Sequence, residues 1–121
     1  MLKTLGIAAR NRGDLLVRCI TSVDLAVEHL FLIDNGNDES VRRSMEQVRN
    51  RQIPNAALFS TITMEKYGNL GCGPSWNRIT LASPGPWLIA GSDIQFSPGT
   101  LALVQARLSE HPDASIICAF G

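Results

Sequence analysis

The 121-residue chain has few cysteines and no excess of charge of either sign. Cys19, Cys72 and Cys118 form no Cys-x-x-Cys pair, and the two histidines are too few for a usual zinc site. This pattern favours free thiols in a reducing compartment, so we expect a cytoplasmic protein. The 11 Lys and Arg residues balance 11 Asp and Glu residues, so the chain lacks the cationic surplus typical of nucleic-acid binders.

Long hydrophobic runs are also missing. The longest, such as residues 30–33 and 116–120, are far shorter than the roughly 20 residues that span a bilayer. We therefore expect no transmembrane segment, and no basic, then apolar, stretch predicts a secretory signal. A composition of 45% hydrophobic and 18% charged residues is typical of a globular protein, and the length suits one domain over residues 1–121.

Short apolar runs alternate with segments of helical periodicity. The expected strands are residues 4–9, 29–33, 58–64, 87–90 and 115–120, and the expected helices are 15–23, 38–51, 75–81 and 99–110. Asp14 is the candidate N-cap of the first helix, and Asp38 or Ser40 that of the second. Alternating strands and helices of this length predict an α/β fold with an open, mainly parallel, Rossmann-like sheet flanked by helices. Ligands of such sheets bind at the carboxyl ends of the strands.

Two of the expected strands end in a carboxylate. Asp34 follows the second strand and Asp93 follows the fourth, where a carboxylate can accept hydrogen bonds from a nucleoside or bind a hard cation. Asp34 could equally be a turn residue that bonds its own backbone, whereas the apolar residues that flank Asp93 disfavour this alternative there. The glycine-rich segment 69–74 precedes a helix and could approach an anion closely, although it is neither a GxGxxG nor a Walker motif.

Four segments in order resemble the nucleotide-binding half of a family-2-type glycosyltransferase with the GT-A fold. They are Ile-Ala-Ala-Arg-Asn-Arg at 7–12, Leu-Ile-Asp-Asn-Gly-Asn at 32–37, Asn-Leu-Gly-Cys-Gly-Pro-Ser-Trp-Asn-Arg at 69–78, and the segment 87–99 with Gly-Ser-Asp and a later Pro-Gly. The third segment is the most specific. The resemblance covers nearly the whole chain, and it implies transfer of a sugar from a nucleoside diphosphate, expected to be a UDP-sugar, to an unknown acceptor.

The resemblance also implies roles for individual residues. The implied nucleotide-binding set is Ala8, Ala9, Asn11, Asp34, Asn69 and Gly71. In this set Asp34 would recognise the base, expected to be uracil. Outside the set, Asn77 would hold the glycine-rich loop and the helix that follows it in position. Asp93 would bind Mn²⁺ or Mg²⁺, which would neutralise charge on the departing nucleoside diphosphate.

The sequence departs from the family pattern in two places. The Asp-x-Asp triplet reads Gly91-Ser92-Asp93, so its first carboxylate is missing and weaker metal binding is expected. The acceptor half that normally follows is not recognisable, and the catalytic base stays unassigned, although Glu65, Glu110 and Asp113 are available.

Two other interpretations stay open. The chain could be a non-catalytic nucleotide-sugar-binding module, or a fragment that needs a partner. A flavodoxin-like or receiver-like domain is disfavoured, because a receiver needs an Asp after the third strand and residues 61–64 supply none. The apolar segment 116–120 would need a covering surface, so we expect self-association into a homo-oligomer.

Overall fold

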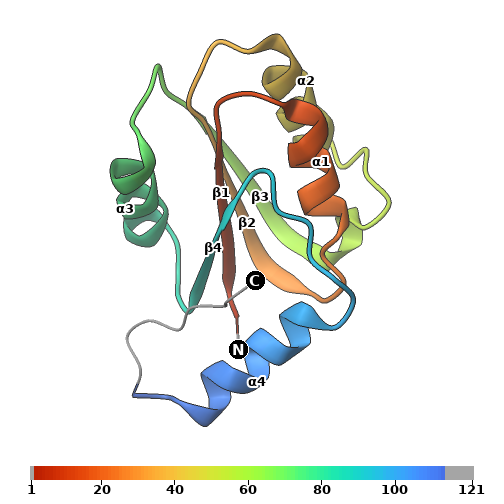
Figure 1. Cartoon of the computed structure of the whole chain (residues 1–121), viewed down its shortest axis with the longest axis vertical. Coiled ribbons are helices and arrows are strands. Elements are labelled where there is room, and N and C mark those ends of the chain that lie inside the picture. The colour runs from red at the N-terminus through yellow and green to blue at the C-terminus, as the bar shows by residue number, and fades with distance from the viewer. Residues whose placement is uncertain (1, 114–121) are drawn as a thin grey trace.

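The computed structural model describes residues 2–113 and consists of a parallel sheet with helices on both faces (Figure 1). The four strands, in the spatial order β3-β2-β1-β4, are all parallel. The elements are β1 (Thr4–Ala9), α1 (Gly13–Thr21), β2 (Val27–Asp34), α2 (Glu39–Arg49), a 3₁₀ turn (Ala56–Leu58), β3 (Phe59–Lys66), α3 (Cys72–Ala82), β4 (Trp87–Gly91) and α4 (Thr100–Glu110). The α/β fold expected from the sequence is thus confirmed.

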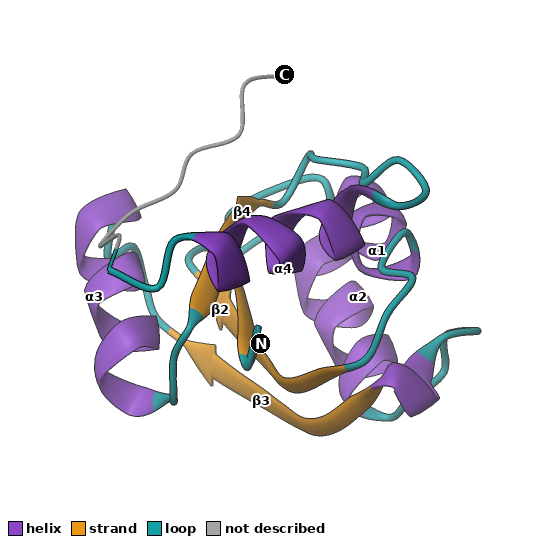
Figure 2. Cartoon of the chain, turned by 90° about the horizontal axis from the view of Figure 1, so that it is seen from below, coloured by secondary structure: helices purple, strands orange, loops and turns teal. Residues whose placement is uncertain are grey.

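The two faces of the sheet are covered unequally. One face carries α1 and α2 over a large apolar core that includes Leu5, Leu16 and Met45. The other face carries α3, over a small cluster in which Ile79 packs with Phe31 and Ile33. Figure 2 shows this asymmetry, with α3 on one side of the strands and α1 and α2 on the other. Helix α4 contributes buried Leu101 to the large core.

Helix α3 lies close to the sheet because β1 has a glycine beneath it. A Cβ added at Gly6 would lie 2.6 Å from Cγ2 of Ile79, far inside van der Waals contact. The absent side chain lets Ile79 settle on the strand. The helix begins at Cys72, three residues before the start expected from the sequence, so Pro74 lies in its first turn.

The helix caps match the sequence prediction at only one of two positions. Asp38 caps α2, where its carboxylate accepts hydrogen bonds from the amides of Ser40 and Val41. The prediction for α1 is wrong: Arg12 is the N-cap, with a left-handed backbone, and Asp14 lies in the first turn. The Asp14 carboxylate binds the Arg12 guanidinium at 2.9 Å instead of the helix amides.

Two further expectations from the sequence concern the strand at 115–120 and membrane-spanning helices. The strand expected at 115–120, on which the expectation of self-association rested, lies outside the described residues. Among residues 2–113, no helix has both the length and the apolar character needed to cross a membrane.

Candidate functional site

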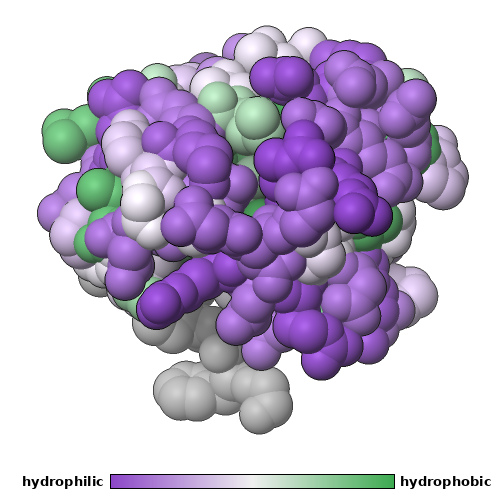
Figure 3. All heavy atoms as spheres, turned by 90° about the horizontal axis from the view of Figure 1, so that it is seen from above, coloured by the Kyte–Doolittle hydropathy of each residue, from purple (hydrophilic) through white to green (hydrophobic). Residues whose placement is uncertain are grey.

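The carboxyl ends of the four strands share one edge of the sheet, and the loops that follow them form the candidate site. The strand register pairs Ala9 with Asp34 across β1 and β2, and Ala8 with Gly91 across β1 and β4. Of the two strands that flank β1, β2 ends at Asp34 and β4 is followed by Asp93. Figure 3 looks onto this end of the molecule and shows a largely hydrophilic surface with paler, more apolar residues between the hydrophilic ones.

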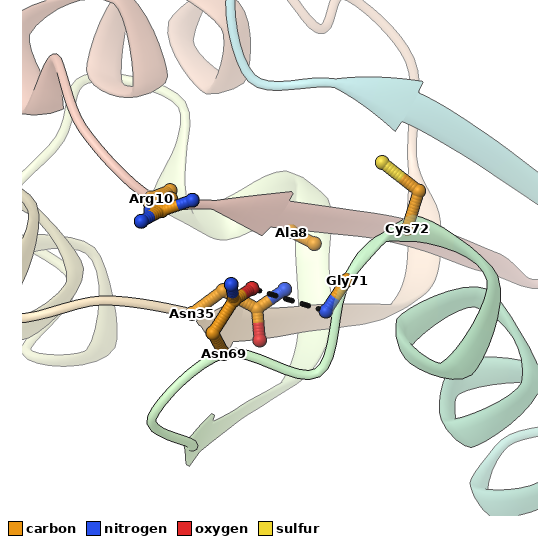
Figure 4. Close-up of a pocket in the computed structure, with 6 residues that line it drawn as sticks. All are labelled: Ala8, Arg10, Asn35, Asn69, Gly71 and Cys72. Atoms are coloured by element: carbon orange, nitrogen blue, oxygen red, sulfur yellow. Dashed lines mark hydrogen bonds between the residues drawn. The ribbon is translucent and has the colours of Figure 1, made fainter.

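A pocket of about 300 Å³ opens at this edge, between β1 and the start of α3. The residues that line it are Ala8, Arg10, Asn35, Asn69, Gly71 and Cys72, shown in Figure 4. Three of the predicted nucleotide-binding residues, namely Ala8, Asn69 and Gly71, are among them. The pocket thus brings the end of β1 together with the glycine-rich segment singled out in the sequence.

The other predicted site residues do not line this pocket. Ala9 is buried in the core on the opposite face of the sheet, because successive strand residues point to opposite faces. Asn11 is exposed in the loop beyond β1. Arg10 is two positions after Ala8, so the same alternation places both on one face of the sheet. Knowing that α3 covers this face would have identified Arg10 as a pocket residue. Asn35 and Cys72 lie next to predicted positions in the sequence, but no feature of the sequence identified either of them as a site residue.

Asn35 fixes the glycine-rich loop to the end of β2. Its side chain is 6% exposed, and its Oδ1 accepts a hydrogen bond from the amide of Leu70 at 3.2 Å. Its Nδ2 donates to Oγ of Ser75 at 2.7 Å, and its own amide donates to the Ala9 carbonyl at 2.8 Å. Through its side-chain amide and its backbone amide, the buried Asn35 therefore joins β1, β2 and α3 around the pocket.

The loop itself requires a glycine at the start of α3. Gly71 has φ 80° and ψ 176°, a region that is essentially restricted to glycine. The Gly71 amide donates a hydrogen bond of 3.2 Å to Oδ1 of Asn69, drawn as the dashed line in Figure 4. This conformation places Gly71 and Cys72, at the start of α3, against the pocket, while the Ser75 amide of the first turn donates to the Gly71 carbonyl.

Asp34 is enclosed rather than open to a ligand. Its side chain is almost completely buried, Oδ1 accepts from the amide of Gly36 at 3.2 Å, and Oδ2 lies 3.3 Å from Nζ of Lys66. The Lys66 ammonium also donates to the Gly36 carbonyl. The role of Asp34 in recognising a base remains a prediction, and in this arrangement it requires the half-exposed Lys66 side chain to move aside.

Asp93 is exposed at the same edge and faces α1. The Arg18 guanidinium donates to the Asp93 carbonyl at 3.5 Å. The thiol of Cys19 lies close by, 3.8 Å from the Gly91 carbonyl. Burial, and secondarily the Asp93 charge, raises the pKa of this thiol to about 12. Among residues 2–113, no group of three or more His, Cys, Asp or Glu side chains is placed to hold a metal ion.

Glu65 holds α3 against β3. Its carboxylate binds Arg78 through two hydrogen bonds of 2.8 and 2.7 Å and accepts a third from the Tyr67 hydroxyl at 2.7 Å. The Arg78 hydrogen bonds, supported by that of Tyr67, hold the pKa of Glu65 below its usual value. A carboxylate paired in this way is a poor general base.

Comparisons with known proteins agree with this fold. No family model matches the sequence, and no curated protein matches it significantly. The crystal structure of S. aureus TarS 1-349 superposes with a TM-score of 0.69 at 17% identity, covering 93% of this chain and 33% of that one. A second TarS structure superposes with a TM-score of 0.67 at 16% identity, covering 93% of this chain and 20% of its own.

TarS is a glycosyltransferase, and the likeness shows that the chain has a glycosyltransferase-like fold. The parallel sheet flanked by helices fits the N-terminal half of a GT-A protein. The chain spans a third or less of the TarS structures that it matches.

Proposed function

We propose that the chain binds a nucleoside-diphosphate sugar, expected to be a UDP-sugar, as the donor-binding part of a glycosyltransferase acting on an unknown acceptor. The observation that carries this proposal is the position of segment 69–74. This segment has the greatest likeness to the family in sequence, and it forms the wall of the pocket facing the end of β1. The fold shared with TarS supports the same class.

The pocket residues suit different parts of such a donor. Ala8 leaves room at the pocket floor for a flat ring or a ribose, and the free amide hydrogens of Asn69 can donate to either. The first turn of α3 offers the backbone amides of Cys72 and Gly73 and the positive end of an 11-residue helix to an anionic group, since Pro74 has no amide hydrogen and the Ser75 amide is already bonded. Asn35 acts indirectly, because its side chain holds the loop in place.

The described residues do not by themselves fit a divalent cation. Asp93 is an exposed carboxylate whose backbone carbonyl accepts from Arg18, and no group of three or more His, Cys, Asp or Glu side chains forms in the described part of the chain. A Mn²⁺ or Mg²⁺ ion would need most of its ligands from the donor's phosphates and from water. Binding of Mn²⁺ or Mg²⁺ by Asp93 therefore stays a prediction, tested below by the Asp93→Asn variant.

A second function is favoured by the composition of the pocket. None of the lining residues within 2–113 has a carboxylate or an imidazole able to accept a proton from an acceptor hydroxyl. A non-catalytic module, or a fragment completed by further chain, would have this property.

A homo-oligomeric state and a cytoplasmic location also stay predictions.

Cys72 provides a direct test of donor binding. It is exposed and lines the pocket, whereas Cys19 is buried. The full chain is treated with a maleimide with and without UDP, CDP or GDP, and modification of each cysteine is measured by peptide mass mapping. At ten times its Kd, a bound nucleotide should slow the modification of Cys72 by about tenfold. Absence of protection, together with no binding by calorimetry, contradicts the proposal.

A variant pair and a turnover assay complete the test. Asn69→Ala should weaken protection, whereas Asn50→Ala, an exposed change at the end of α2, should leave it unchanged. Release of UDP from a panel of UDP-sugars, with and without sugar acceptors, distinguishes the two functions. Binding without turnover above a protein-free blank favours the binding module.

A further inference from the structure

Arg10 is the one charged residue among the described residues that line the pocket. It follows directly after β1, on the same face as Ala8, and its side chain is exposed. The ion pairs formed within residues 2–113 all use other cations. The guanidinium is therefore available for an anionic ligand.

The side chains around Arg10 add little net charge that would oppose an anion, because Lys66 and Asp34 neutralise each other. Gly36 lies between the two cations: its carbonyl accepts a hydrogen bond from Lys66, and a Cβ added at Gly36 would lie 3.1 Å from Cγ of Arg10. The nearby carboxylate of Asp34 is buried and already paired with Lys66. The positive end of α3 forms the facing wall. An anion entering the pocket thus meets attraction on two sides.

The edge on the other side of β1 is less suited to neutralising a diphosphate. Asp93 adds negative charge there, and Arg18 contacts its carbonyl at 3.5 Å. A cation bound at Asp93 alone would keep one protein ligand and would lie near a guanidinium. Among the described residues, the cation that lines the pocket is Arg10.

We propose that Arg10 binds the phosphate groups of the nucleotide donor and that the chain binds this donor without requiring a divalent cation. The inference rests on the proposed function and assigns it a further binding residue. A guanidinium offers several N–H donors in a planar fork, which suits phosphate oxygens. Arg10 then supplies charge that the resemblance assigned to a metal held by Asp93.

The experiment measures binding of three probes, UDP, UMP and uridine, to the full chain by calorimetry, in EDTA and in Mn²⁺. The variants are Arg10→Gln, Arg10→Lys and Asp93→Asn. Arg49→Gln is the matched control, because Arg49 is exposed on α2 and its loss changes the net charge equally. Circular dichroism and thermal unfolding establish that each variant is folded.

In EDTA, Arg10→Gln should weaken UDP binding by about 10-fold to 100-fold, the loss expected for hydrogen bonds to a charged group. Uridine binding should stay within about twofold of the parent, since it has no phosphate. Arg10→Lys should retain part of the UDP affinity, and Arg49→Gln and Asp93→Asn should retain all of it. UDP affinity of the parent should be similar in EDTA and in Mn²⁺.

Two results would overturn this inference while leaving the proposed function standing. One is UDP binding that needs Mn²⁺ and disappears in Asp93→Asn. The other is an Arg10→Gln variant that binds UDP as the parent does, or that loses uridine and UDP affinity equally. If Arg10→Gln does not fold, Arg10→Lys and the weakening of parental UDP binding by salt carry the test. Failure of every nucleotide to bind in either condition instead contradicts the proposed function itself.

Discussion

The side-chain amide of Asn35 donates a hydrogen bond of 2.7 Å to the hydroxyl of Ser75, joining the end of β2 to the first turn of α3. Both residues are buried, and the Ser75 hydroxyl in turn donates to the Gly71 carbonyl. The two residues are 40 positions apart in the chain. Their contact sets where the glycine-rich loop lies relative to the strand ends, and therefore the shape of the pocket.

Asn35→Ala should destabilise the fold and weaken nucleotide binding together. The change leaves the Leu70 amide and the Ser75 hydroxyl without their partner, a cost of about 1–3 kcal/mol in the free energy of unfolding. Urea denaturation measures the loss. Asn37→Ala, an exposed change in the same loop, should cost less than about 0.5 kcal/mol. In a double-mutant cycle with Ser75→Ala, additive effects would contradict direct coupling.

Gly71→Ala and Gly73→Ala should have opposite effects. Neither added Cβ meets another atom within 4 Å, so the difference is one of backbone conformation. The positive φ of Gly71 is strained for alanine and should cost about 1–3 kcal/mol. Gly73 lies inside α3, where alanine should be neutral or stabilising by about 0.4–1 kcal/mol. Equal changes in the unfolding free energy of the two variants would contradict the conformation of the loop.

The Glu65–Arg78 pair should make stability depend on pH. Pairing with Arg78 lowers the pKa of Glu65 in the folded protein. The ionised carboxylate therefore stabilises the fold at pH values above its ordinary pKa of 4.5. This stabilisation is lost as the pH falls through the lower pKa of the folded state. At pH 7, Glu65→Gln should cost about 0.5–1 kcal/mol, since Arg78 is half-exposed. The difference from the parent should shrink in acid. An unchanged difference between pH 7 and pH 3 would show that the charge has no part in it.

Cys72 and Cys19 should differ strongly in thiol reactivity. The Cys72 thiol is exposed at the pocket, whereas burial raises the pKa of the Cys19 thiol to about 12. At pH 8, maleimide should modify Cys72 within minutes and leave Cys19 unmodified until the protein unfolds. Peptide mapping over time, with a urea-denatured sample as the control, measures both. Comparable rates in the folded chain would contradict the placement of Cys19 in the core.

Much of the fold could be predicted because it depends on local patterns. The strand at 4–9 agrees with β1 at both ends, since a short apolar run bounded by Asn11 and Gly13 leaves few alternatives. The Asp38 cap was predictable because it depends on the two amides that follow it. Asp14 was mispredicted for a long-range reason: Gly13 donates its amide to Oγ of Ser40 from the next helix, and Asp14 binds Arg12 instead.

The candidate site was predictable only in part. Asn69, Gly71 and Ala8 were identified because the segments that contain them resemble the glycosyltransferase family, and all three line the pocket. Arg10 was missed as a pocket residue because its orientation depends on which face α3 covers. The enclosure of Asp34 depends on Lys66, 32 positions away, whose side chain the sequence does not place.

From the sequence alone, the order of strands and helices follows from the hydrophobic period and the turn residues. The position of Asp34, Asn69 and Asp93 at one edge of the sheet follows as well, because parallel strands end at the same edge. The packing of α3 on Gly6 and the hydrogen bonds of Asn35 decided the rest: which side chains line the pocket and which are enclosed. These are contacts between distant residues, and their geometry exists only once the sheet has assembled and its two faces have been covered.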